Sequence, residues 1–221
     1  MKTRRLLDQT LAPDGQTMAL YEHDGVYSIR VGGIELMSTR RHASEEKLAE
    51  LACAPVRRRR CARVLIGGLG FGFTLRAALA ALAPDAEVIL AELSAAVIAW
   101  NREPAYGLAA GALADPRVEV QQRDVADVIA ESRGAFDTIV LDVDNGPAAL
   151  TTELNRRLYE AAGLRAIRKA LRTGGVLGVW SAAPAPAFEK LLAKQGFTVE
   201  VHRCRAHPSG GARHIIFLAS I

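Results

Sequence analysis

The sequence predicts an α/β fold with a seven-stranded, mostly parallel sheet, a C-terminal antiparallel hairpin and a short N-terminal β unit. Short apolar segments alternate with helical segments from residue 62 to residue 196, a pattern typical of parallel strands covered by helices on both faces. Four glycines cluster directly after the first of these strands. The last two predicted strands are joined by Pro-Ser-Gly-Gly without a helix, so we expect them to pair antiparallel.

Composition excludes several classes of protein. With 221 residues, 50% of them hydrophobic, the chain is long enough to bury a full core. The net charge is only +4, and the basic run 57–60 lacks interleaved aromatics, so we expect a solvated loop and no nucleic-acid partner. No apolar leader or membrane-length segment is present, and the three cysteines have no pairing or metal-ligand spacing. We therefore expect a cytoplasmic protein without membrane association or metal.

Residues 1–43 are predicted to form the N-terminal β unit, beginning with a loosely held start over Met1–Pro13. Alternating polar and apolar residues then predict strands, and His23-Asp24-Gly25 is a typical hairpin turn. These strands are 16–22, 26–31 and 34–37. Such a thin sheet is not stable by itself, so it must pack on the main domain or on a second subunit.

Residues 44–221 are predicted to form the main domain, starting with a helix over 44–52 that Ser44 caps. Apolar, β-branched runs predict its strands, at 62–66, 87–92, 117–122, 136–142, 176–181, 198–205 and 213–220. Periodic apolar residues predict the helices between them, at 73–83, 94–102, 125–132, 150–172 and 186–195.

The glycine cluster between strand 62–66 and helix 73–83 is the first candidate binding element. Glycine adopts positive φ and lets a ligand approach bare backbone, and the following helix start offers free N–H groups. Gly68, Gly70 and Gly72 give G-x-G-x-G, whereas the dinucleotide fingerprint would need glycine at Phe73. No Gly-Lys-Ser/Thr follows either, so the spacing favours a nucleotide-type ligand outside these two classes over a plain tight turn.

Acidic residues end the next three predicted parallel strands. Glu92 is positioned to accept hydrogen bonds from a ribose diol, and Asp124 from an adenine amino group. Asp142 follows the fourth strand. Because carboxyl ends of parallel strands meet at one edge of a sheet, we expect these carboxylates beside the glycine cluster.

Four segments together resemble the Rossmann-like methyltransferase fold that binds S-adenosylmethionine, and more closely its spermidine synthase (polyamine aminopropyltransferase) branch. They are Val64-Leu-Ile-Gly-Gly-Leu-Gly-Phe-Gly72, Ala91-Glu-Leu-Ser-Ala-Ala-Val-Ile98, Arg123-Asp124 and Phe136-Asp-Thr-Ile-Val-Leu-Asp-Val-Asp-Asn-Gly-Pro147. The resemblance covers roughly residues 25–197 and is most specific over 142–147. It implies the methyltransferase strand arrangement and a homodimer formed through the N-terminal strands.

The resemblance also implies the roles of individual residues. S-adenosylmethionine or its decarboxylated form would be a co-substrate, bound by Gly68, Gly70, Phe71, Gly72, Glu92, Leu93, Asp124 and Val125. Asp142 would be catalytic, binding the acceptor amine and taking part in its deprotonation. Asp144 and Asn145 of the same loop are further candidate contacts to a small-molecule amine or other nucleophile. Two more candidates come from the residues themselves: His42 as a base, because the pKa of imidazole lies near neutrality, and Glu45 as an acidic contact.

Two departures from the family keep three functions open. Phe71 stands where spermidine synthases carry an Asp that contacts the donor amine. The segment before the first core strand lacks the family Tyr and contains Arg40 and Arg41, which would repel a diamine. Aminopropyl transfer is favoured; methyl transfer to a small molecule and non-catalytic nucleoside binding are the alternatives.

Overall fold

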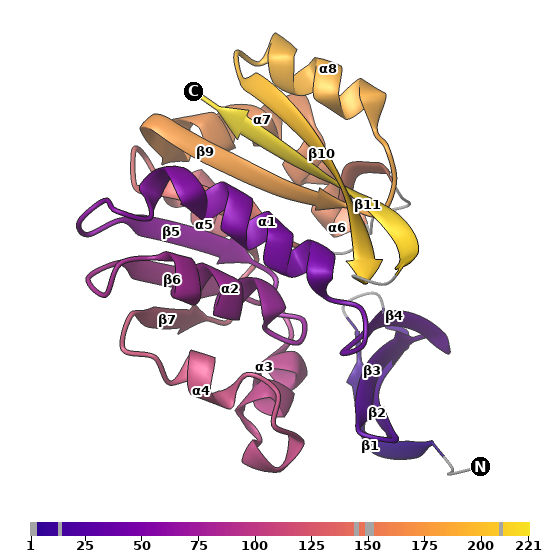
Figure 1. Ribbon diagram of the computed structural model, residues 1–221. Coiled ribbons are helices and arrows are strands. Elements are labelled where there is room, and N and C mark those ends of the chain that lie inside the picture. The colour runs from indigo at the N-terminus through magenta and orange to yellow at the C-terminus, as the bar shows by residue number, and fades with distance from the viewer. Residues whose placement is uncertain (1–3, 13–14, 144–145, 149–152, 208–209) are drawn as a thin grey trace.

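The computed structural model describes residues 4–12, 15–143, 146–148, 153–207 and 210–221. A seven-stranded sheet of order β10-β11-β9-β8-β5-β6-β7 forms the body, beside a four-stranded sheet of order β1-β2-β3-β4 (Figure 1). The strands are β1 Arg5–Leu11, β2 Thr17–His23, β3 Val26–Val31, β4 Ile34–Ser38, β5 Arg63–Gly67, β6 Glu87–Ala91, β7 Val118–Gln121, β8 Phe136–Leu141, β9 Leu171–Ser181, β10 Thr198–His207 and β11 Gly210–Ser220.

Eight α-helices and four short 3-10 helices complete the described structure. The α-helices are α1 Ala43–Cys53, α2 Phe73–Ala81, α3 Ala95–Arg102, α4 Ala110–Leu113, α5 Val125–Glu131, α6 Glu153–Arg156, α7 Ala161–Ala170 and α8 Pro186–Lys194. The 3-10 helices are η1 Ala54–Val56, η2 Pro104–Tyr106, η3 Gly146–Ala148 and η4 Arg157–Tyr159.

The seven-stranded sheet confirms the predicted fold class. β5 pairs in parallel with β6 and β8, and β8 pairs in parallel with β9, whereas β11 lies antiparallel to both β9 and β10. All six residues of β8 are buried, as expected for a strand covered on both faces. Ile66 in β5 lies opposite Leu90 and Val140.

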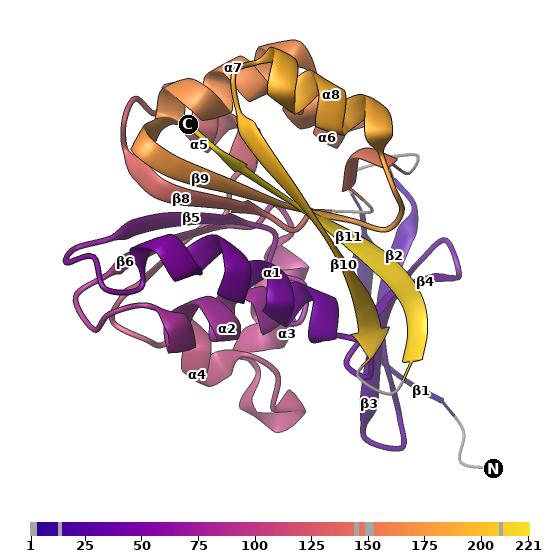
Figure 2. The same cartoon turned by 45° about the horizontal axis from the view of Figure 1, so that its top comes forward.

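Helices cover the two faces of this sheet in two layers (Figure 2). α1, α2 and α3 pack on one face through side chains such as Leu48, Leu75 and Ile98. α5, α7 and α8 pack on the other face through residues such as Ile129 and Ile167. Each layer buries the apolar stripe of its helices, which gives the sheet a hydrophobic core on both sides.

The N-terminal unit contains one strand more than predicted. The expected loose start over Met1–Pro13 is wrong for Arg5–Leu11, which forms β1 and pairs antiparallel with β2. Asp8 in this strand accepts a hydrogen bond of 2.6 Å from Trp100 Nε1, and this contact ties β1 to α3. The domain boundary after residue 43 stays a prediction. Leu20 of this unit and Leu48 of α1 belong to the same hydrophobic core.

Two predicted helices differ from the observed ones. His42, not Ser44, occupies the N-cap of α1, and Ser44 is fully buried in the first turn. In the region predicted as one helix over 150–172, the described residues form α6, η4 and α7, because Glu160 is extended, at φ −89° and ψ 166°. β9 already begins at Leu171, which lies opposite Phe136.

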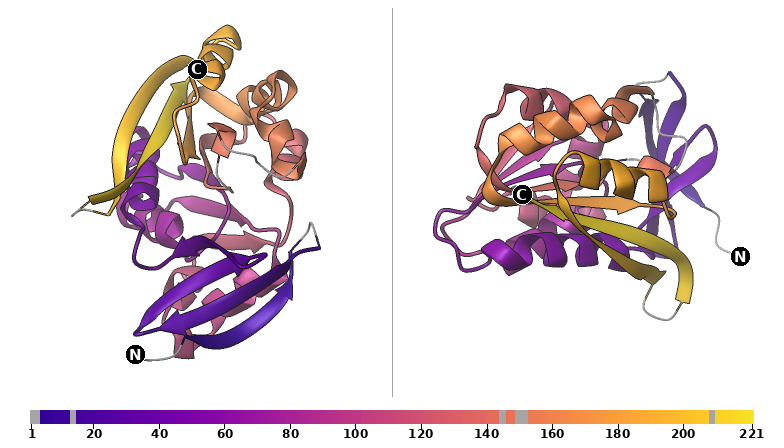
Figure 3. Two further views of the ribbon diagram at one scale, coloured as in Figure 1. Left: turned by 90° about the vertical axis from the view of Figure 1, so that its right-hand side faces the viewer. Right: turned by 90° about the horizontal axis from the view of Figure 1, so that it is seen from above.

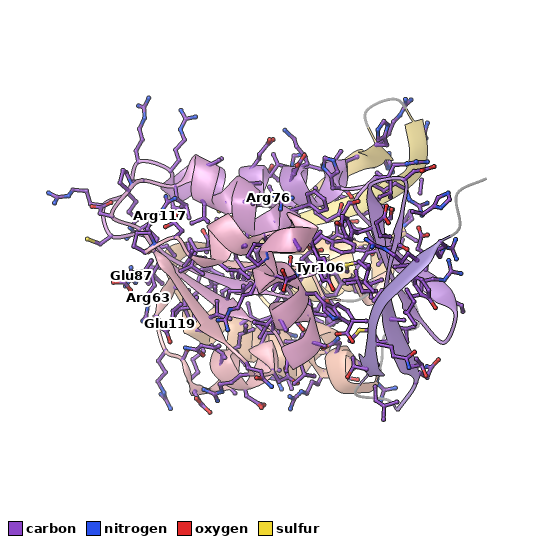
Figure 4. All side chains as sticks on the ribbon, turned by 90° about the horizontal axis from the view of Figure 1, so that it is seen from below. Arg63, Arg76, Glu87, Tyr106, Arg117 and Glu119 are labelled. Atoms are coloured by element: carbon purple, nitrogen blue, oxygen red, sulfur yellow. The ribbon has the colours of Figure 1, made fainter. Side chains whose placement is uncertain are left out.

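The amino ends of the parallel strands carry charged side chains on the side away from the four-stranded sheet, where Arg63, Glu87, Arg117 and Glu119 lie (Figure 4). The basic run is anchored there, because Arg59 pairs at 2.9 Å with the fully buried Asp137. Asp137 also pairs with Arg172 at 2.7 Å and accepts a hydrogen bond from the Arg63 backbone N–H. All four arginines of the run are exposed, as expected for a solvated loop, and Arg59 in addition ties the loop to Asp137.

The described residues contain no helix that is long and apolar enough to cross a membrane. Across the same described ranges, no group of three or more His, Cys, Asp or Glu side chains is arranged to hold a metal ion.

Candidate functional site

A cavity of about 490 Å³ lies at the carboxyl ends of the parallel strands. Its volume falls within the usual range for small-molecule sites. Figure 3 shows the four-stranded sheet at this end of the body, and that sheet contributes Met18, Ile29 and Met37 to the wall. The glycine cluster, the ends of β6 and β8 and the β10–β11 hairpin contribute further residues, as do Glu45 of α1, Asp124 after β7 and Trp180 of β9.

The glycine cluster must be glycine for steric reasons. Gly68 has φ +92°, and a Cβ atom there would lie 2.2 Å from the Asp142 carbonyl oxygen. Gly70 has φ +52°, and the Asn101 side-chain amide donates to its carbonyl oxygen at 2.8 Å. Both line the cavity, whereas Gly72 is the N-cap of α2 and lies against Ala109. The loop therefore presents rigid, bare backbone to a ligand.

Glu92 is held in place by both of its carboxylate oxygens. Oε2 accepts from the Leu69 N–H at 2.9 Å, and Oε1 accepts from the Ser94 N–H at 2.8 Å. A carboxylate can accept about four hydrogen bonds. Glu92 and its neighbour Leu93 line the cavity. The geometry suits the predicted ribose contact, which stays a prediction.

Replacing Glu92 with Gln is expected to weaken binding of methylthioadenosine by roughly 10–100-fold, because hydrogen bonds to a charged acceptor contribute about 1.5–3 kcal/mol. The side-chain amide of the new Gln would also place its N–H group against the backbone N–H of Leu69 or Ser94, and two donors cannot form a hydrogen bond. Calorimetric titration measures the change. Glu87→Gln, at the opposite end of the sheet, is the matched control, and equal affinity of the two variants would contradict the ribose role.

Asp124 is engaged in two contacts within the protein. Oδ1 accepts from the Ala126 N–H at 2.8 Å and caps α5, and Oδ2 pairs with Arg157 at 2.7 Å. It still lines the cavity beside Val125, whose side chain fills the space above Gly67. Its contact with adenine stays a prediction. Sequence reasoning missed Arg157, because 33 residues separate it from Asp124 and no local pattern links them.

Asp142 and Glu45 form a pair of carboxyl groups on the cavity wall. Asp142 follows β8, and its Oδ2 accepts from the Thr74 hydroxyl at 2.5 Å. Burial raises the pKa of Asp142 to about 6, although the Thr74 hydrogen bond acts in the opposite direction. Burial and then the charge of Asp142 raise the pKa of Glu45 to about 7. Both groups therefore exchange protons near neutral pH.

Ser44 connects Glu45 to the C-terminal hairpin. Its hydroxyl oxygen accepts from Trp180 Nε1 at 3.1 Å and lies 2.8 Å from His214 Nδ1. It is also hydrogen-bonded to Glu45 Oε2. Trp180 is half-buried and lines the cavity.

Comparisons with known proteins point to one enzyme family. No family model matches the chain. It is 36% identical over 111 residues to a polyamine aminopropyltransferase of Nitrosomonas europaea, a match that covers 48% of this chain and 32% of that protein. A polyamine aminopropyltransferase of Synechococcus sp. is 30% identical over 128 residues, which cover 56% of this chain and 38% of that protein.

About half of the chain is thus similar in sequence to polyamine aminopropyltransferases. Its matches span only about a third of the length of these curated relatives. A spermidine synthase from Thermotoga maritima superposes with a TM-score of 0.75 at 23% identity, covering 98% of this chain and 72% of that one. A spermidine synthase in complex with the transition-state analogue AdoDATO gives the same score and coverage at 22% identity. At these identities the structures establish the fold.

The structure brings some of the other predicted contacts to the cavity and leaves others away from it. Glu45 and Phe71 line the cavity, and Phe71 is 3% exposed. His42 is not among the lining residues; it stacks on Phe73 at 4.3 Å and pairs with Glu46 at 3.0 Å, so it is not brought together with Asp142. Asp144 and Asn145 lie outside the described residues.

The two arginines that depart from the aminopropyltransferase pattern differ in position. Arg41 lines the cavity, where its guanidinium is paired with Glu35, whereas Arg40 is not among the lining residues. The charge that would repel a diamine is therefore largely offset by an acidic neighbour.

Proposed function

We propose that this protein transfers an aminopropyl group from decarboxylated S-adenosylmethionine to an amine. The charge of the cavity wall carries this proposal, together with the curated relatives. Among the described residues, five carboxyl groups and two guanidinium groups line the cavity: Glu35, Glu45, Glu92, Asp124 and Asp142 against Arg41 and Arg123. Arg41 is paired with Glu35, Arg123 with Glu131 and Asp124 with Arg157. The other carboxyl groups, on Glu45, Glu92 and Asp142, make the wall favour cationic substrates.

The proposed reaction needs positioning and one proton acceptor. The amine nitrogen attacks the aminopropyl carbon that is bonded to the sulfonium sulfur. A C–N bond forms as this C–S bond breaks, and methylthioadenosine leaves. The glycine cluster and Glu92 would hold the adenosyl part, so that the carbon to be attacked faces Asp142. An ammonium group must lose a proton before it can attack, and the Asp142–Glu45 pair, with pKa values of about 6 and 7, is suited to accept it.

Methyl transfer from S-adenosylmethionine is the second candidate, supported by two side chains on the cavity wall. Phe71 offers no charge to a donor ammonium group, and Arg41 could bind the carboxylate that intact S-adenosylmethionine carries. The pairing of Arg41 with Glu35 weakens this alternative.

Side-by-side calorimetric titration with S-adenosylmethionine, decarboxylated S-adenosylmethionine and methylthioadenosine tests the proposal. We expect tighter binding of the decarboxylated donor, followed by release of methylthioadenosine when diamines are screened as acceptors. Tighter binding of S-adenosylmethionine would favour methyl transfer. Binding of a nucleoside without turnover of any amine would favour a non-catalytic role, and binding of none would overturn the nucleoside site.

We also infer a homodimer formed through the four-stranded sheet. Its outer strands expose Leu6, Leu11 and Ile34, at 46%, 70% and 76% of their surface. Burying such side chains against a second copy would gain about 25 cal/mol per Å². Light scattering is expected to give twice the chain mass, and a monomer at every concentration would remove the inference. A cytoplasmic location stays a prediction.

A further inference from the structure

A continuous hydrogen-bonded chain leads from the carboxyl pair to the C-terminal hairpin. Ser44 is fully buried in the first turn of α1, and its hydroxyl group contacts three side chains from three elements. The contacts are to Glu45 Oε2 on the same helix, Trp180 Nε1 on β9 and His214 Nδ1 on β11. A serine hydroxyl has one donor hydrogen and two acceptor lone pairs, so these partners use its full capacity.

Trp180 restricts how the Ser44 hydroxyl is used. The indole N–H can only donate, so it occupies one lone pair of the Ser44 oxygen. The second lone pair and the hydrogen remain for Glu45 and His214. When Glu45 is protonated it can donate to Ser44, and Ser44 then donates to Nδ1 of a neutral His214.

The surroundings of His214 keep it neutral and fixed. Burial, together with the nearby charge of Arg41, lowers the pKa of His214. The ring packs edge-on against Trp180, with 4.6 Å between centroids, and the backbone carbonyl of His214 accepts a hydrogen bond from the Cys204 thiol of β10. A neutral imidazole that accepts at Nδ1 carries its proton at Nε2.

We propose that Glu45, Ser44 and His214 form a proton-release path for the proton that the carboxyl pair takes from the attacking amine. The inference rests on the proposed function. The ammonium proton passes to the Asp142–Glu45 pair, and protonated Glu45 then donates to Ser44 Oγ. Ser44 passes its own hydrogen to His214 Nδ1, and His214 loses its Nε2 proton to solvent. One proton enters the path and one leaves it, so no co-reactant is required.

The charged and titratable groups around Glu45 come from several elements. Asp142 follows β8, Glu46 lies on α1, Cys204 on β10 and His214 on β11. Thr74 of α2 contacts both residues of the pair. Its hydroxyl donates to the Asp142 carboxylate and lies 3.4 Å from the backbone carbonyl oxygen of Glu45. Asp142 is the neighbour whose charge raises the pKa of Glu45 most. Deprotonating either member therefore favours retention of the proton on the other.

Ser44→Ala and His214→Gln test the path, with His202→Gln on the same hairpin as the control. In single-turnover assays both test variants are expected to lower the rate of transfer about tenfold or more, with methylthioadenosine affinity unchanged. Added imidazole buffer should restore much of the lost rate, since it accepts the proton directly from the cavity. A loss of rate that imidazole does not restore, or no loss, would overturn the path in favour of a structural tie between α1 and the hairpin.

Imidazole ¹⁵N resonances of His214 give a readout that does not require activity. In the unaltered protein we expect the Nε2–H tautomer, with a chemical-shift step near pH 7 as Glu45 titrates. Ser44→Ala should remove this step, and its persistence in that variant would refute the connection. If the unaltered protein transfers no aminopropyl group, the proposed function fails, and the ¹⁵N titration alone decides whether the path exists.

Discussion

Replacing Asp142 with Asn is expected to lower kcat for aminopropyl transfer by about 10²–10⁴-fold, the usual contribution of a general base. Asn has nearly the same shape and can still accept from the Thr74 hydroxyl, but it cannot take a proton. Because the glycine cluster and Glu92 are untouched, methylthioadenosine affinity should stay within a few-fold. Steady-state kinetics with calorimetry on the same preparation separates the two effects.

Asp85→Asn is the matched control for this prediction. Asp85 is a partly exposed carboxylate outside the cavity, where it pairs with Arg60. Its replacement should leave kcat unchanged. An Asp142→Asn variant with normal kcat would contradict the assignment of the proton acceptor, and lost nucleoside affinity would indicate a distorted loop instead.

The same substitution has a consequence for pH dependence. Folding raises the pKa of Asp142 from 3.8 to about 6 and that of Glu45 from 4.5 to about 7. The folded protein thus binds protons more tightly than the unfolded chain, and the stabilisation from both groups is complete below about pH 4 and lost as pH rises through 6 and 7. Asp142→Asn should lower the pKa of Glu45 and raise Tm relative to the unaltered protein at pH 8, measured by calorimetry.

Replacing Asp137 with Ala is expected to lower the free energy of unfolding by roughly 3 kcal/mol. Its carboxylate is fully buried at the start of β8 and holds Arg59 and Arg172. It also accepts the Arg63 backbone N–H at 2.7 Å. The substitution leaves that N–H without its acceptor and releases two arginines from an ion cluster.

Urea unfolding monitored by circular dichroism measures this loss. Asp85→Asn is again the control, because its partner Arg60 belongs to the same basic run but the pair is exposed, so the change should stay within about 0.5 kcal/mol. Similar midpoints for the two variants would show that the Asp137 cluster contributes no more than a surface ion pair.

The parts of the site that the sequence predicts are those with local signals. Gly68 and Gly70 lie between a buried strand and a helix, and Glu92 ends the next strand, so their meeting follows from parallel pairing alone. Glu45 is predicted only as an acidic residue close to Arg40 and Arg41. Its pKa is raised by burial and then by the charge of Asp142, and no local pattern reveals either, because 97 residues separate the two carboxyl groups.

Other features depend on register and packing. His214 faces Ser44 only because β11 enters the sheet beside β9, where Ile215 lies opposite Ser181. β1 was missed because Arg5–Leu11 mixes exposed polar and apolar residues, and its position depends on Asp8 meeting Trp100. Likewise, the partner of Arg59 is Asp137, a charged residue inside an apolar strand pattern.

The position of β11 between β9 and β10 determines the order in which the molecule is completed during synthesis. Strands β5 to β8 lie within residues 63–141 and pair with one another, so this part of the sheet can form while the rest of the chain is still being synthesised. β10 has no hydrogen-bonding neighbour in the sheet until residues 210–220 emerge and insert beside it. Nascent chains therefore form the glycine-cluster side of the cavity before they acquire His214, and the cavity wall is complete only when the last strand has paired.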